Sequence, residues 1–192
     1  NALIVLDDAN LDIAVNAAII SAFKTSGQRC TSASRFIVHE KVLSEFEKRF
    51  VETTKRLRIG NPLDEDIFMG PVINQSATEK IARYNELAKK EGVMVLLDGG
   101  RLTGEHYKKG YFMSPFVYRM ENNPMSRVLR EEVFGPHVAI VPVKDIDEAI
   151  EVHNDTDYGL SCAVITEDFR KARRIRDDCE YGLGYVNLPT IG

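Results

Sequence analysis

Cys30 is the residue of this sequence whose type and surroundings best suit covalent chemistry. It follows the expected end of a helix and lies in a loop of small and polar residues, GQRCTSAS at 27–34. Small neighbours leave room for a substrate to approach the sulfur, and the adjacent Arg29 favours the thiolate, which is the form that attacks. The residues alone therefore make Cys30 a candidate nucleophile, although small polar loops are common in proteins.

The other two cysteines lack these features. Cys162 lies in the apolar run SCAVI, where a cysteine behaves as a small buried hydrophobic residue. Cys179 follows two acids at an expected helix end, and negative charge there disfavours a thiolate. Three cysteines without the spacing of a disulfide framework or a zinc site indicate a reducing compartment, so we expect a cytoplasmic protein.

A thiolate nucleophile is usually assisted by a base and by hydrogen-bond donors to the developing oxyanion. The candidate bases are the four histidines, His39, His106, His137 and His153. The sequence places none of them beside Cys30. No group of His, Cys and Asp residues has the spacing of metal ligands either, so we expect no metal ion.

The second unusual segment is EEVFGP at 131–136, in which two acids precede an aromatic residue and a Gly-Pro break. Taken alone, such a segment is typical of a solvated turn whose aromatic residue, Phe134, packs on the core. Its residue types alone do not predict a function.

The elements that must position these loops alternate between strands and helices. Apolar runs predict strands at 2–6, 35–39, 93–97, 111–118, 138–143, 162–165 and 184–187. Helical patterns follow at 11–24, 41–58, 77–91 and 168–178, and Asp145 with Glu148 forms a capping box for one more. Pro115 predicts an edge or bent strand. This alternation predicts a single α/β domain over 1–192, with an open, mainly parallel twisted sheet covered by helices on both faces.

The composition excludes several classes of function. The net charge is -4, and the one basic cluster, at 170–176, is followed at once by acids, so a nucleic-acid partner is not expected. No apolar run approaches the roughly 18 residues of a membrane helix. The glycines form neither a G-x-G-x-x-G fingerprint after a strand nor a P-loop, so the chain carries no phosphate-binding motif of its own.

Two motifs carry a resemblance to a known family. The segment GQRCT at 27–31 resembles the active-site cysteine motif of the aldehyde dehydrogenase superfamily, and EEVFGP at 131–136 is similar to that family's second motif. Further matches follow in order and cover essentially the whole chain: Gly60-Asn61-Pro62, Gly70-Pro71, Gly110-Tyr111-Phe112 with Pro115, Asn154 with Tyr158-Gly159-Leu160, and Gly184 to Asn187.

The resemblance implies a function and roles for single residues. Cys30 is expected to attack an aldehyde as a thiolate, giving a thiohemiacetal, while its backbone N–H donates to the oxyanion. Hydride transfer to NAD or NADP and hydrolysis of the resulting thioester yield a carboxylic acid. Glu132 is expected to bind the nicotinamide ribose hydroxyls, and Phe134 to pack near the nicotinamide. The implied partners are a small-molecule aldehyde and further copies of the chain in a homo-oligomer.

Several parts of that family's machinery have no counterpart in this sequence. They are the general-base glutamate, the side-chain amide of the oxyanion hole, the dinucleotide-binding domain and the terminal oligomerisation strand. We therefore expect a catalytic domain that is truncated at both ends and inactive by itself, with the cofactor bound mainly by the missing domain. Ser32 stands where a smaller residue is more usual, and we expect little effect from it.

Two other classes of function remain open. A truncated paralogue kept as a non-catalytic assembly or binding module would share this sequence, and the coding sequence on either side would distinguish it. A cysteine hydrolase would pair Cys30 with a histidine, and substitution of the four histidines one at a time would test it.

Overall fold

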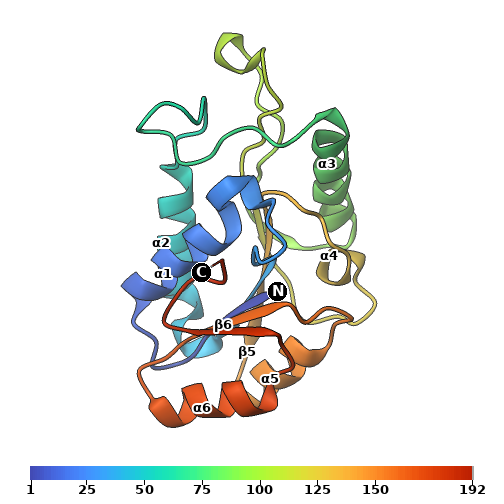
Figure 1. The fold of residues 1–192 in the computed structure, drawn as a ribbon. Helices are drawn as coiled ribbons and strands as arrows, with labels where there is room; N and C mark the ends of the chain where they lie inside the picture. Colours follow the sequence, from blue (N-terminus) through green and yellow to red (C-terminus); the bar gives the residue numbers. More distant parts are fainter. Residues whose placement is uncertain (192) are drawn as a thin grey trace.

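The structure is a computed structural model that describes residues 1–191. Within these residues the strands form one seven-stranded sheet in the order β3-β4-β5-β2-β1-β6-β7. Figure 1 shows helices on the left and on the right of this sheet. All neighbours are parallel except β3 and β4, which are antiparallel. The strands are β1 (Ala2–Val5), β2 (Arg35–His39), β3 (Met94–Leu97), β4 (Phe116–Arg119), β5 (His137–Val143), β6 (Ser161–Ile165) and β7 (Leu183–Val186).

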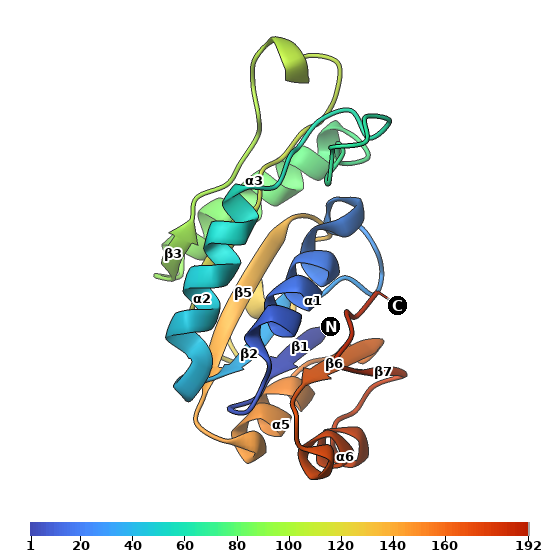
Figure 2. The same cartoon turned by 90° about the vertical axis from the view of Figure 1, so that its left-hand side faces the viewer.

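Helices cover both faces of this sheet. They are α1 (Leu11–Phe23), α2 (Glu40–Lys55), α3 (Gln75–Lys90), α4 (Arg127–Arg130), α5 (Ile146–Asn154) and α6 (Phe169–Asp178), with 3₁₀ turns at Lys24–Gly27 and Glu105–Tyr107. Helices α1 and α2 pack on one face, toward the viewer in Figure 2, and α3, α5 and α6 pack on the other. The predicted α/β class with a mainly parallel sheet is confirmed.

Alternation along the strands divides the core into two layers. In β1, Leu3 and Val5 join the cluster that packs against α1 and α2, whereas Ala2 and Ile4 join the cluster on the opposite face. All four side chains are buried, which is why a central parallel strand reads as a continuous apolar run.

Three details of the sequence prediction were wrong. The strand expected over 111–118 is Phe116–Arg119, so Pro115 directly precedes it, and because β4 lies between β3 and β5 the edge alternative is wrong. The helix expected to reach residue 58 ends at Lys55. In the expected capping box, Asp145 accepts from Glu148 N at 2.9 Å, but the Glu148 carboxylate accepts from Lys144 N at 2.8 Å rather than from Asp145.

The amino ends of the central strands lie side by side. Ala2 pairs with Arg35 of β2 and with Cys162 of β6, and β2 in turn pairs with β5. The loops that enter these strands, at 28–34, 131–136 and 155–160, therefore meet at the same edge of the sheet. Because both sequence motifs lie in these loops, the topology brings them together.

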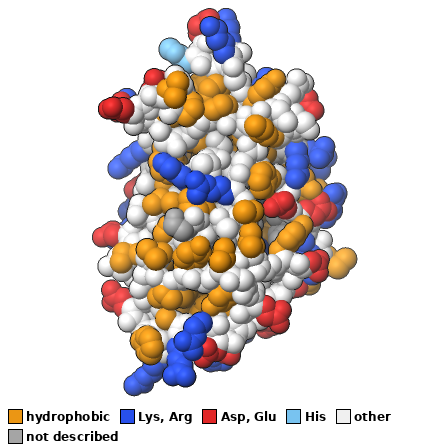
Figure 3. All heavy atoms as spheres, viewed as in Figure 1, with side chains coloured by type: hydrophobic (Ala, Val, Ile, Leu, Met, Phe, Trp, Pro, Cys, Tyr) orange, Lys and Arg blue, Asp and Glu red, His pale blue; other side chains and the backbone are white. Residues whose placement is uncertain are grey.

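One side of the sheet ends in the short strand β7, which pairs only with β6 in the described part of the chain. Figure 3 shows hydrophobic side chains gathered across the middle of the face on which β7 lies. The exposed large apolar residues of this region are Tyr158, Leu160, Leu183, Val186 and Leu188. No helix within residues 1–191 is long and apolar enough to span a membrane.

Candidate active site

A cavity of about 170 Å³ opens at the amino edge of the sheet. Its walls include Cys30, Glu132 and Phe134, together with Asn1 and the segment 158–160. The structure thus brings the three predicted site residues to one cavity, although they come from loops far apart in the sequence. Within residues 1–191 no group of three or more His, Cys, Asp or Glu side chains could hold a metal ion.

Cys30 is exposed, whereas Cys162 and Cys179 are buried. Burial and the contact between the two buried thiols raise the pKa of Cys162, with the hydrogen bond to Cys179 as the larger cause. Cys162 is therefore a poor nucleophile, because the thiolate is the reactive form. Accessibility and chemistry both favour Cys30 as the reactive thiol.

The chain reaches Cys30 through a strained turn. Thr25, Ser26 and Gly27 are three consecutive residues with positive φ, at 55°, 59° and 66°. For a residue with a Cβ this left-handed conformation costs roughly 1–2 kcal/mol, so two such residues in a row need external support. The hydroxyl of Ser26 supplies part of it by donating to the carbonyl of Gly70 at 2.8 Å. Strain of this kind concentrates at functional sites.

Asn1 holds the cysteine loop against the sheet. Its side-chain Nδ2 donates to the carbonyls of Cys30, at 2.6 Å, and Ser32, at 3.0 Å, while its Oδ1 accepts from Ser161 N at 2.9 Å. The sequence interpretation missed Asn1 because no local pattern links it to residues 30 and 161. The hydroxyl of Ser32, for which little effect was expected, accepts from Arg29 N at 3.2 Å and helps to close the turn around Cys30.

The backbone N–H of Cys30 makes no hydrogen bond to any group within residues 1–191, whereas the N–H groups of Gln28, Arg29, Ser32 and Ala33 are all engaged. The N–H of Thr31 has no partner among these residues either, so the turn carries two free backbone donors, at Cys30 and at the next residue.

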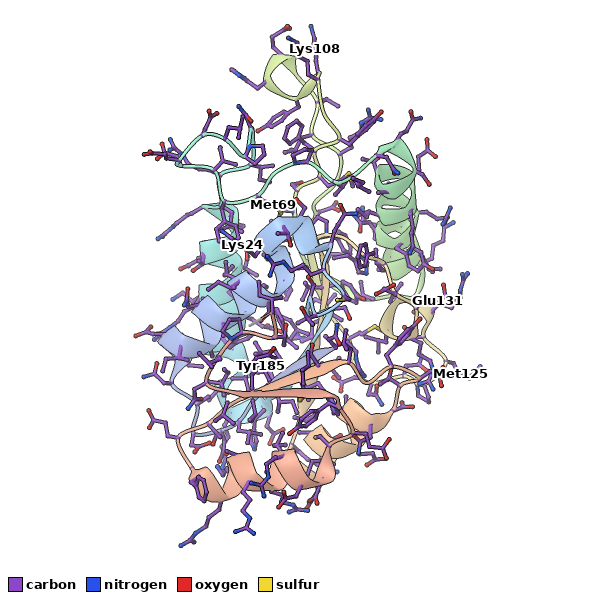
Figure 4. All side chains as sticks on the ribbon, in the orientation of Figure 1. Lys24, Met69, Lys108, Met125, Glu131 and Tyr185 are labelled. Atoms are coloured by element: carbon purple, nitrogen blue, oxygen red, sulfur yellow. The ribbon has the colours of Figure 1, made fainter. Side chains whose placement is uncertain are left out.

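The two acids of the second motif have different surroundings. Glu131 accepts two hydrogen bonds from Arg127, at 2.6 and 3.1 Å, and one from the hydroxyl of Tyr84 on α3. The hydrogen bond from Arg127, followed by that from Tyr84, lowers the pKa of Glu131 to about 2. Figure 4 shows Glu131 beside α3 and α4. Glu131 therefore anchors the loop.

Glu132, by contrast, is exposed at the cavity, and no group within residues 1–191 bonds to its carboxylate. Its neighbour Val133 is buried, and Phe134, with φ of 62°, is 38% exposed and lines the cavity. The interpretation of this segment as a turn with Phe134 packed on the core is therefore wrong: Val133 fills the core. Glu132 and Phe134 are both exposed and line the cavity.

The two motif loops touch through their backbones. A Cβ added at Gly27 would lie 2.6 Å from the carbonyl oxygen of Gly135, and one added at Gly135 would lie 2.3 Å from the side chain of Ile81. Glycine at position 27 is therefore required for the two loops to approach each other, whereas a Cβ at position 135 would press on the side chain of Ile81 on α3 and not on the cysteine loop.

Among residues 1–191, His137 is the one histidine that lines the cavity of Cys30; His153 is buried outside that lining and has an unpartnered Nδ1. His39 accepts from Lys41 N at the opposite edge of the sheet, and His106 lies on the protruding 3₁₀ turn Glu105–Tyr107. His137 lines the cavity, but its ring nitrogens contact Asn85, at 2.8 Å, and Tyr118, at 3.2 Å. Burial lowers the pKa of His137 to about 3 and that of His153 to about 4. This arrangement disfavours a cysteine hydrolase.

Comparison with known proteins identifies the family. The profile described as the aldehyde dehydrogenase family matches residues 1–192. This chain belongs to the aldehyde dehydrogenase family. It is 34% identical over 192 residues to alpha-ketoglutaric semialdehyde dehydrogenase of Bacillus subtilis, covering 100% of this chain and 39% of that protein. It is 41% identical over 190 residues to 1-pyrroline-5-carboxylate dehydrogenase of Geobacillus sp., covering 99% of this chain and 36% of that protein.

Solved structures agree with this family assignment. The fold is similar to betaine aldehyde dehydrogenase from Staphylococcus aureus, with a TM-score of 0.94, 34% identity, and 98% of this chain and 37% of that chain covered. A second structure of that enzyme, also with a TM-score of 0.94, is a complex with NAD+ and carries a BME-modified cysteine. The chain therefore spans between 36% and 39% of the length of these relatives.

Proposed function

We propose that this chain is the cysteine-bearing part of an enzyme that oxidises a small-molecule aldehyde to a carboxylic acid, with NAD or NADP as the hydride acceptor. The observation that carries the proposal is the meeting of Cys30, Glu132 and Phe134 at one cavity. Membership of the aldehyde dehydrogenase family supports it, as does the relative that was solved with NAD+ and a modified cysteine.

Cys30 is the proposed nucleophile. Its thiolate sulfur forms a bond to the aldehyde carbon, and the carbonyl oxygen takes up the negative charge as a thiohemiacetal forms. The free N–H of Cys30 is one donor to that oxygen, and a donor of this kind contributes about 10²–10³ in rate. Loss of hydride from the same carbon leaves a thioester, which water hydrolyses to the acid and the free thiol.

Glu132 and Phe134 are the proposed contacts to the nicotinamide end of the cofactor. An exposed carboxylate without a protein partner offers two acceptor oxygens to a ribose diol, and an exposed aromatic side chain can pack against a flat ring. When bound, the dinucleotide supplies the acceptor for the hydride. The cavity of about 170 Å³ is small beside the roughly 300–1,000 Å³ of most ligand sites. It suits one end of the cofactor, and we infer that the rest binds outside this chain.

The reaction also needs groups that we assign to the remaining length of the enzyme. These are a base that activates water, worth about 10²–10⁴ in rate, a second oxyanion donor, and a domain that holds the dinucleotide. We therefore expect this 192-residue chain to be inactive by itself. The exposed apolar side chains near β7 support a homo-oligomer, and the three free cysteines agree with a cytoplasmic location.

The test compares the full-length protein with the 192-residue chain, using several aldehydes with NAD and with NADP. Formation of the reduced cofactor is followed by absorbance, and limiting iodoacetamide with peptide mass spectrometry identifies the fastest thiol. We expect turnover by the full-length protein alone and preferential labelling of Cys30. A full-length protein that folds but oxidises no aldehyde would instead support a non-catalytic paralogue, and preferential labelling of Cys162 or Cys179 would contradict the assignment of the nucleophile.

A further inference from the structure

The side chain of Gln28 connects three segments of the chain, two of which carry residues that line the cavity. Its Nε2 donates to the backbone carbonyl of Phe134 at 3.1 Å, and its Oε1 accepts from the backbone N–H of Ile73 at 2.9 Å. Gln28 itself belongs to the turn that carries Cys30, and its own N–H donates to the Thr25 carbonyl at 3.1 Å. One amide group thus links the cysteine loop, the Phe134 loop and the segment 70–73.

The partners of Gln28 determine how its amide is oriented. A backbone N–H can only donate, and a backbone carbonyl can only accept, so the oxygen must face Ile73 and the nitrogen must face Phe134. Neither bond survives if the amide is reversed. A group that accepts but does not donate could keep the bond to Ile73 and would lose the bond to Phe134.

Two of the three segments joined by Gln28 contain residues with a strained backbone. Thr25 and Ser26 lie in the left-handed region on one side, and Phe134 lies there on the other. Backbone strain of this kind persists only where surrounding contacts over-determine the conformation. The hydroxyl of Ser26 holds the first loop to Gly70, but the bond from Gln28 to the Phe134 carbonyl is the side-chain link between the two loops themselves.

We propose that Gln28 is a positioning residue that couples the cysteine loop to the Phe134 loop, so that the nucleophile and the cofactor-facing side chains keep one relative placement. The catalytic meaning of this coupling rests on the proposed function, whereas the mechanical link does not. Reacting groups must be held close to their productive geometry, and a misplacement of about 1 Å can reduce the rate by about 10²-fold.

Two variants of the full-length protein remove either the bond from Gln28 to the Phe134 carbonyl alone or both bonds of the Gln28 amide. Gln28→Glu is nearly isosteric and keeps an acceptor for Ile73, but places a carboxylate against the Phe134 carbonyl. Gln28→Met removes both bonds. The matched control is Gln75→Glu, because Gln75 is an exposed residue on α3 whose amide donates only to Glu79.

Two rates in the cofactor-free protein report on the two loops. Chymotrypsin cleaves after exposed aromatic residues, and the carbonyl that it attacks at Phe134 is the one bonded by Gln28. Cleavage after Phe169, which is 76% exposed on α6, serves as an internal reference in the same digest. The rate of Cys30 alkylation by iodoacetamide reports on the other loop.

We expect Gln28→Glu and Gln28→Met to accelerate both Phe134 cleavage and Cys30 alkylation at least about threefold, with Phe169 cleavage unchanged and Gln75→Glu like the wild type. In turnover, we expect the cofactor KM to rise and kcat to fall, each about 3- to 10-fold. If only one of the two rates rose, either Phe134 cleavage or Cys30 alkylation, the proposed coupling would be wrong. If cleavage after Phe169 rose by the same factor, Gln28 would be a general stabilising residue. If the wild type oxidises no aldehyde, the proposed function fails. The rates of Phe134 cleavage and Cys30 alkylation, which need no cofactor, still show whether Gln28 couples the two loops.

Discussion

The polar residues at the carboxyl ends of the central strands are hydrogen-bonded, whereas the candidate reactive groups at the amino ends are left without partners in the described residues. At the carboxyl edge, Asp8 accepts from the hydroxyl of Thr166, at 2.8 and 2.9 Å, and from Asp168 N, at 2.8 Å. Lys171 donates to both Asp7 and Asp8. Burial acts to raise the pKa of Asp8, but the bonds from Thr166 and Lys171 outweigh it and hold that pKa below its usual value. The acids of this edge are satisfied.

The amino edge leaves its reactive groups unsatisfied. Cys30 is exposed, its N–H is unbonded within residues 1–191, and the Glu132 carboxylate has no partner among the same residues. Open α/β sheets usually bind ligands at the carboxyl ends of their strands. Here hydrogen bonds and ion pairs occupy the polar groups at the carboxyl ends of the strands, and the cavity opens at their amino ends. In this structure the unsatisfied groups and the strained residues 25–27 and 134 therefore gather at the amino edge, and not at the edge that the general rule favours.

The largest expected effect comes from two thiols near the amino ends of the strands, of which Cys30 is exposed and Cys162 is buried. We expect Cys30→Ala to reduce aldehyde oxidation by the full-length protein at least about 10³-fold, because the covalent route is lost. The matched change Cys162→Ala, in a buried strand, should keep kcat within about twofold and cost about 1 kcal/mol of stability. Steady-state kinetics and urea unfolding measure both. Comparable activity in the two variants would remove Cys30 from the mechanism.

Glu131 and Glu132 are adjacent, yet substitution of one should affect stability and substitution of the other should affect turnover. Glu132→Gln should slow turnover about 10- to 100-fold while leaving the melting temperature within about 2 °C, because no protein group depends on this carboxylate. Glu131→Gln should instead lower stability by about 0.5–1 kcal/mol, since Arg127 and Tyr84 lose a charged partner. Kinetics and thermal melts of both variants check this, and a reversed pattern would exchange the two roles.

At the carboxyl edge, Asp8→Ala should affect stability and leave the chemistry unchanged. The variant deprives Thr166 and Asp168 N–H of an acceptor, which should cost about 1–3 kcal/mol in urea unfolding. Turnover per folded molecule should stay within about twofold of wild type. A loss of kcat beyond that, at equal folded fraction, would mean that this edge contributes to the reaction.

The smallest expected effect is the pH dependence of the Glu131 anchor. Its folded-state pKa of about 2 lies below the value of about 4.3 for an unfolded glutamate. Its stabilising contribution is therefore full above the unfolded-state pKa and is lost as the pH falls toward the folded-state value. Because the side chain is 39% exposed, solvent screening limits that contribution to about 0.5 kcal/mol.

The urea midpoints of wild type and Glu131→Gln, measured between about pH 7 and about pH 3, test this directly. The difference between them should be constant down to about pH 5 and should narrow below it. A difference that grows on acidification would show that the sign of the pKa shift is wrong.

Most of the fold followed from local patterns. The run 35–39 was expected to be a strand and is β2, and Asn10 and Asp145 were recognised as helix caps because a cap is defined by residues within one turn. The edge-strand expectation for 111–118 failed because the position of a strand in a sheet depends on which distant strands join it. Helix α4 was missed because four residues are too few to show a period.

The sequence by itself determined the α/β class and made Cys30, rather than the two other cysteines, the candidate nucleophile. Both conclusions depend on residue type and near neighbours, whereas the roles proposed for Glu132 and Phe134 came from the motif resemblance. Only the tertiary structure decided that the two motif loops meet, because the parallel pairing of β1, β2, β5 and β6 brings their amino ends together. It also distinguished Glu131 from Glu132, since identical side chains differ only in the distant residues that reach them.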